Sequence, residues 1–98
     1  MKRAILGLDT SCYTTSCALM GEDGKVEADV RMGLQVPRGE RGLRQSEAVF
    51  EHLKQLPAAL EQAFGQAGPL WLAGVCASEK PVDDEDSYMP VFQAGLSF

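Results

Sequence analysis

The sequence predicts one small α/β domain in which three strands form an antiparallel meander, followed by a helix and a fourth strand parallel to the first. Strand-length apolar segments recur with turn residues between them. One longer segment has the apolar periodicity of a helix. A wholly apolar strand then follows that helix, which places it parallel to an earlier strand. A chain of 98 residues suits a single domain.

The first strand is predicted over residues 4–8, a continuous apolar run typical of a strand covered on both faces. The second is predicted over residues 15–20. After the turn sequence GEDG (21–24), apolar and charged residues alternate strictly from residue 25 to residue 34. This alternation predicts a half-buried third strand near a sheet edge.

A helix is predicted from an apolar stripe at alternating steps of four and three residues. The stripe consists of Val49, Leu53, Leu56, Leu60 and Phe64. Because Pro57 removes a backbone donor and clashes with the preceding turn, we expect a kink or two short helices meeting near Leu56. GQAGP (65–69) ends the helix. LWLAGVCA (70–77) predicts a central fourth strand, and a last helix is predicted to begin at Pro90.

Composition narrows the classes of partner. A net charge of −5 argues against nucleic-acid binding by phosphate neutralisation through this chain alone. Cys12, Cys17 and Cys76 lack CxxC spacing, which favours reduced core thiols in a cytosolic protein. No apolar run approaches ~18 residues, so we expect no membrane span.

Trp71 and Phe64 are most simply interpreted as core residues.

The join between the first two strands is unusually polar. Asp9 is predicted to end the first strand, and residues 10–14 to form the turn into the second. Successive backbone N–H groups with short hydroxyl side chains can form a concave anion site. An aspartate at the strand end can hold Mg²⁺, often through water, and the metal bridges phosphate oxygens. The alternative is a polar hairpin whose Thr and Ser side chains satisfy local backbone groups.

The predicted order of elements is also the opening of the ribonuclease H-like fold, which actin-like ATPases duplicate around a nucleotide cleft. Three segments carry a more specific resemblance: ILGLDTSCYTTSCAL (5–19), RGLRQSEAVFEHLKQLP (41–57) and SEKPVDDEDSYMPVFQAG (78–95). Together they resemble the N-terminal part of the glycoprotease family, also called O-sialoglycoprotein endopeptidases, which makes threonylcarbamoyladenosine in tRNA. The likeness is greatest to a branch from Gram-positive bacteria.

The resemblance implies an actin-like ATPase that binds ATP or an acyl-adenylate with Mg²⁺ and transfers a threonylcarbamoyl group to a tRNA adenosine, together with other tRNA-modification proteins. It matches Asp9, Thr10, Ser11 and Cys12 to the family's first phosphate loop. The family's iron or zinc site uses a histidine pair farther along the chain. We therefore expect residues 1–98 to be the N-terminal ribonuclease H-like subdomain of a longer cytoplasmic protein, inactive by itself.

Tyr13 and Thr14 stand where well-studied members of the family carry an acidic pair. This replacement favours a second hypothesis, a non-catalytic paralogue that serves as a binding or dimerisation partner of an active member. A metalloprotease, suggested by the older family label, lacks support because the sequence has no HExxH motif. The half-sheet exposed in a fragment also predicts self-association.

Three further features each allow two interpretations. His52 is expected at the helix surface or core edge rather than in a cleft. Arg38, Arg41 and Arg44 could contact tRNA or nucleotide phosphates, but a solvated loop is favoured. The acidic run 83–86 could hold a divalent cation, but adjacent acidic side chains rarely converge, which again favours a solvated loop.

Overall fold

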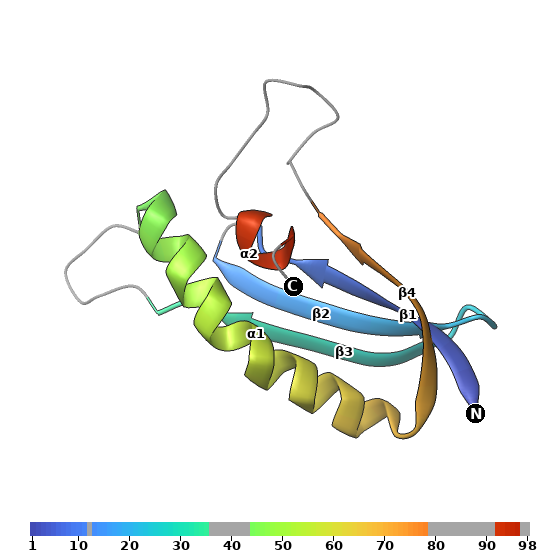
Figure 1. Ribbon diagram of the computed structural model, residues 1–98. Coiled ribbons are helices and arrows are strands. Elements are labelled where there is room, and N and C mark those ends of the chain that lie inside the picture. Colours follow the sequence, from blue (N-terminus) through green and yellow to red (C-terminus); the bar gives the residue numbers. More distant parts are fainter. Residues whose placement is uncertain (12, 36–43, 79–91, 97–98) are drawn as a thin grey trace.

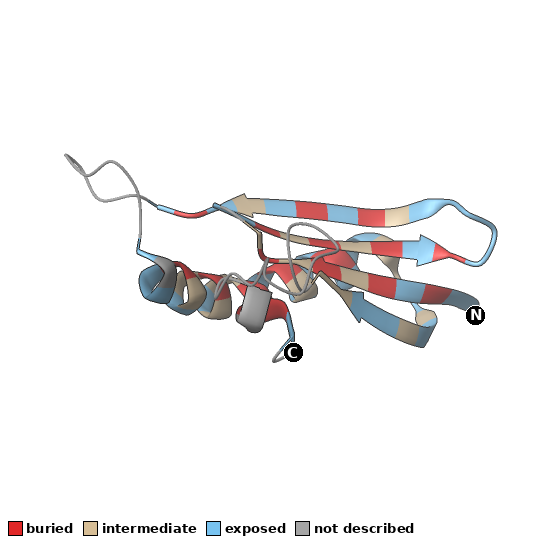
Figure 2. Ribbon diagram, turned by 90° about the horizontal axis from the view of Figure 1, so that it is seen from above, coloured by how far each residue is buried: buried red, intermediate tan, exposed pale blue. Residues whose placement is uncertain are grey.

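The computed structural model describes residues 1–11, 13–35, 44–78 and 92–96. Their elements are, in order, β1 (Lys2–Asp9), β2 (Thr14–Gly21), β3 (Val26–Gly33), α1 (Gln45–Ala67), β4 (Leu70–Ala77) and α2 (Phe92–Leu96). They form two layers, with both helices on the same face of the sheet (Figures 1 and 2). No helix in the described ranges is long and apolar enough to cross a membrane.

The sheet is mixed and has the strand order β3-β2-β1-β4. β1 is antiparallel to β2, β2 is antiparallel to β3, and β4 is parallel to β1 after the crossover through α1. The Gly24 N–H donates to the Gly21 carbonyl (3.0 Å), and Gly24 has φ 83°, which closes the predicted GEDG turn. The predicted α/β class, meander and parallel fourth strand are therefore confirmed.

The predicted central position of β4 is wrong for the sheet that the described residues form, in which β4 is one edge. Trp71, which we expected in the core, is 64% exposed, and Val75 is 54% exposed. β1 is central, but its Ile5 is 51% exposed on the face without helices. The physical reason is twofold: both described helices lie on one face of the sheet (Figure 2), which leaves Trp71 and Ile5 uncovered, and α1 packs on β2 and β3 rather than on β4, which leaves Val75 exposed on the helix side.

Helix α1 continues without interruption through Pro57, so of the two predicted alternatives, a kink or two short helices meeting near Leu56, the second is wrong. Pro57 is exposed. On the outer side of a helix, water can bond the carbonyl that loses its donor, which reduces the cost of the proline. The helix end is as predicted: Gly68 has φ 73°, and its N–H donates to the Phe64 carbonyl at 3.1 Å.

The buried face of α1 lies beside the predicted stripe rather than along it. Its buried residues are Ala48, His52, Leu56, Ala59 and Ala63. Leu56 is fully buried, whereas Leu53 and Leu60 are partly buried, and Phe64, expected in the core, is 36% exposed. Because alanines let the helix backbone approach the sheet closely, Leu53, Leu60 and Phe64 lie at the flanks of the contact, whereas Leu56 lies within it.

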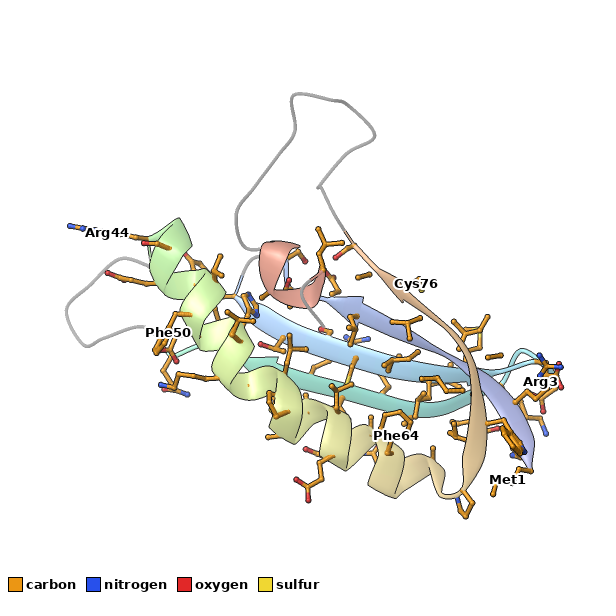
Figure 3. The ribbon with its side chains drawn as sticks, viewed as in Figure 1. Met1, Arg3, Arg44, Phe50, Phe64 and Cys76 are labelled. Carbon is orange, nitrogen blue, oxygen red and sulfur yellow. The ribbon has the colours of Figure 1, made fainter. Side chains whose placement is uncertain are left out.

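The two described cysteines differ in environment. Cys17, on β2, is buried, and its thiol donates to the Ala59 carbonyl of α1 at 3.3 Å. Cys76, on β4, is exposed (Figure 3), so its predicted place in the core is wrong for the same reason that β4 is uncovered. Cys12 lies outside the described residues.

Candidate functional site

The candidate site lies where β1 and β4 end. Because these strands are parallel, their carboxyl ends meet, and ligands of open α/β sheets bind in such places. The Ser78 N–H donates to the Leu8 carbonyl (3.0 Å), which carries the hydrogen bonding one residue beyond β4. The Ser78 hydroxyl donates to Asp9 Oδ1 at 2.7 Å. Ser78 was not among the predicted site residues, and only the parallel pairing of β1 with β4 indicates its role.

Asp9 also organises the turn that follows it. The Ser11 N–H donates to Asp9 Oδ1 at 3.0 Å, and the Ser11 hydroxyl donates to Asp9 Oδ2 at 3.0 Å. This is a local aspartate turn of the kind that short polar side chains stabilise. The turn closes with the Thr14 N–H at 3.4 Å from the Ser11 carbonyl. The anion-site hypothesis directs the N–H and the hydroxyl of Ser11 at a ligand. In the structure, both groups donate to the Asp9 carboxylate instead.

The Asp9 carboxyl group is held in its ionised form. Burial raises its pKa, but hydrogen bonds from Ser78 and Ser11, together with the electrostatic influence of His52, lower the pKa by more. The net pKa therefore lies below the ordinary value of 3.8. An ionised carboxylate at a strand end is suited to hold a cation or a cation-bound water.

This pKa shift predicts a pH dependence of folding. Since the folded pKa of Asp9 is below the unfolded value of 3.8, Asp9 stabilises the fold above that pH and ceases to do so as the pH falls through its folded pKa. We expect the difference in free energy of unfolding between the wild type and Asp9→Asn to shrink as the pH is lowered through this range. Urea unfolding of both proteins at a series of pH values measures it. A difference that stays constant would contradict the shift.

The number of acceptor positions on the Asp9 carboxylate suits a cation that is bound through water. A carboxylate offers about four lone-pair positions, and the described residues use three of them, two on Oδ1 and one on Oδ2. The position on Oδ2 that no described residue uses suits a water of a hydrated Mg²⁺, which keeps several waters and needs only one or two protein carboxylates. Within the described ranges, no three His, Cys, Asp or Glu side chains gather into a site that would bind a metal without a phosphate.

Thr10, the next residue of the predicted phosphate loop, is fully buried. Its Oγ1 accepts a hydrogen bond from the Gly95 N–H of α2 at 3.2 Å. A side-chain carbon added at Gly95 would lie 3.4 Å from this oxygen, so α2 lies directly over Thr10. Asp9 and Ser11 thus form the partly exposed part of the loop, while Thr10 anchors it from beneath.

A second anchor involves His52, and it corrects the expectation of a surface or core-edge histidine. His52 is fully buried, and its Nδ1 lies 2.7 Å from Oγ1 of the equally buried Thr15. Gln55, one helical turn later, donates to the same oxygen at 3.3 Å. Thr15 lies on the helix-facing side of β2, where a hydroxyl requires a buried partner. The sequence contained this signal, because a threonine there cannot be satisfied by an apolar helix stripe.

The other residues considered in the sequence are exposed or lie outside the described residues. Tyr13 is 43% exposed, and its carbonyl accepts the Leu34 N–H at 2.7 Å. Thr14 is also exposed. Arg44 projects away from the sheet at the start of α1, and its N–H donates to Glu47 (3.4 Å), which caps the helix (Figure 3). Residues outside the described ranges include Cys12, Arg38, Arg41, the acidic run 83–86 and Pro90.

Hollows lined by described residues lie at the opposite end of the sheet from Asp9. One of them, of about 420 Å³, is bordered by residues that include Arg3, Trp71 and Leu72. β1 separates this end from Asp9 by roughly 20 Å, at about 3.3 Å per residue. These hollows are therefore separate from the candidate site.

Comparison with known proteins adds no further assignment. No protein-family model matches the chain, and a search of curated proteins finds no match.

Proposed function

We propose that this domain binds the phosphate end of a nucleotide, together with Mg²⁺, at the carboxyl ends of β1 and β4. The observation that carries the proposal is the ionised Asp9 carboxylate at the end of a central strand, oriented by Ser11 and Ser78. Mg²⁺, when bound, would neutralise phosphate charge that the carboxylate would otherwise repel. Asp9 would hold it through water, while Ser11 and Ser78 keep the carboxylate in one orientation.

The order of elements supports a ribonuclease H-like subdomain of the actin-like ATPase type. On the resemblance to the glycoprotease family, the parent protein is a cytoplasmic bacterial transferase that moves a threonylcarbamoyl group from an acyl-adenylate to a tRNA adenosine. Its iron or zinc site and its tRNA contacts belong to other parts of that protein. Residues 1–98 contribute binding and orientation, with Asp9, Thr10, Ser11 and Cys12 as the loop.

A second candidate function is that of a non-catalytic paralogue, a binding partner of an active family member. The exposed residues Tyr13 and Thr14 favour it, because neither can act as a carboxylate base. The two candidates differ in turnover: both bind nucleotide at Asp9, but only the transferase modifies tRNA when supplied with threonylcarbamoyl-adenylate.

Titration calorimetry of the full-length protein with ATP, with and without Mg²⁺, tests the site. Asp9→Ala should weaken Mg²⁺-dependent binding by about 10- to 100-fold, because hydrogen bonds to charged groups contribute about 1.5–3 kcal/mol. Asp23→Ala is the matched control, since Asp23 is an exposed carboxylate in the turn at the other end of β2. Equal affinities of wild type and Asp9→Ala would remove Asp9 from the site.

A further inference from the structure

Two buried threonines lie at the base of the polar loop between β1 and β2. The register of these strands places Asp9 opposite Ser16, and one step farther along the same register places Thr10 opposite Thr15. Both threonines are fully buried. Because side chains alternate between the faces of a sheet, Asp9, which lies between the buried Leu8 and Thr10, is on the face away from the helices. The two threonines therefore hold the loop from the helix side.

Each threonine is bonded to a different helix. On α2, the Gly95 N–H donates to Thr10 Oγ1 at 3.2 Å. On α1, Nδ1 of His52 lies 2.7 Å from Thr15 Oγ1, and the Gln55 amide donates to the same oxygen at 3.3 Å. Both helices lie on one face of the sheet (Figures 1 and 2). The loop is therefore fixed to the helix layer at both of its ends.

The hydroxyl of Thr15 both accepts and donates. Since the Gln55 amide donates to its oxygen, the hydroxyl proton is available for Nδ1 of His52. Valine has nearly the shape of threonine but can neither accept nor donate, so at this position it would leave two polar groups of α1 facing a methyl group. Serine would keep both hydrogen bonds. These two replacements therefore separate the hydrogen bonding of Thr15 from its packing.

We propose that Thr15 and His52 are positioning residues for the ligand of Asp9, a role that rests on the proposed function. Thr15 follows Thr14, whose N–H lies 3.4 Å from the Ser11 carbonyl, so a displacement of Thr15 passes directly into the turn. The N–H and hydroxyl of Ser11 donate to the Asp9 carboxylate and orient it. The pair thus acts on the ligand through the turn, from the opposite face of the sheet.

Titration calorimetry of the full-length protein with ATP and Mg²⁺ tests this role. Thr15→Val should weaken binding about fivefold or more, whereas Thr15→Ser should bind like the wild type. Leu56→Ala is the matched control, because Leu56 is fully buried on the same helix but packs in the apolar core. It should lower the free energy of unfolding and leave the affinity unchanged. Without nucleotide, hydrogen exchange at the Ser11 and Thr14 amides should be faster in Thr15→Val than in Leu56→Ala.

Circular dichroism and urea unfolding check that each variant folds. Gln55→Ala, at a partly buried position, is the milder variant if Thr15→Val does not fold, and it should weaken binding in the same direction. A wild type that binds no nucleotide overturns the proposed function and this role with it. Binding weakened by Asp9→Ala but unchanged in Thr15→Val and Gln55→Ala overturns this role alone. Equal weakening by Leu56→Ala and Thr15→Val also overturns it, because general loss of stability then explains both.

Discussion

Replacing His52 by Ala should lower the free energy of unfolding by about 3–5 kcal/mol. The imidazole is fully buried between α1 and β2, so its removal leaves a cavity. The hydroxyl of Thr15 also loses its 2.7 Å partner in a site that water does not reach. Small domains have a total stability of about 5–15 kcal/mol, so this one substitution would remove a large part of it.

Urea denaturation of His52→Ala and of Lys54→Ala measures this effect against a matched control. Lys54 is exposed on the same helix, and its contacts with Glu51 and Phe50 lie at the surface, where such pairs contribute at most about 1 kcal/mol. His52→Asn should recover part of the loss, because an amide can replace Nδ1 as the partner of Thr15. Equal stability of His52→Ala and Lys54→Ala would show that the buried pair contributes nothing.

Leu56→Ala should cost about 2–5 kcal/mol, whereas Phe64→Ala should cost less than about 1 kcal/mol. The apolar stripe predicted from the sequence places both residues on the buried face of the helix. In the fold, Leu56 is fully buried, but Phe64 is 36% exposed at the flank of α1. Thermal and urea unfolding of the two variants therefore distinguish the observed helix face from the predicted one. A larger loss for Phe64→Ala would favour the predicted stripe.

The strands could be predicted because their signals are local. Alternation after residue 25 and the GEDG turn determine where β3 begins and which of its faces is buried. The parallel position of β4 follows from a general rule, since a strand that returns after a helix crosses over the sheet. Asp9 could be placed at the end of β1 from a local signal as well, because the apolar run of residues 4–8 ends just before it.

The packing of α1 could not be predicted from periodicity. A hydrophobic stripe gives weight to large apolar side chains, but the residues of α1 that join the buried core cluster are Leu56 and the small Ala59 and Ala63, which permit close approach. The burial of His52 depends on Thr15, a residue 37 positions away. No local pattern contains that information.

Of the two described residues that donate hydrogen bonds to Asp9, only Ser11 could be predicted from the sequence. Its partner Ser11 is two residues away and belongs to a recognisable turn. Ser78 is 69 residues away, and only the completed sheet brings it to the carboxylate. The apolar sequence of β4 likewise indicates that the strand needs coverage without stating which polypeptide provides it.

The hydrogen bond between Ser78 and Asp9 has a consequence for the order of folding. The β1–β2–β3 meander forms through short loops, whereas the Ser78–Asp9 contact closes a loop of 69 residues, whose entropy cost is paid late. A chain emerging from the ribosome would therefore hold the Asp9–Ser11 turn well before its carboxylate is fully oriented. Competence to bind a ligand at Asp9 would then arise with the docking of β4, as one of the last events of folding.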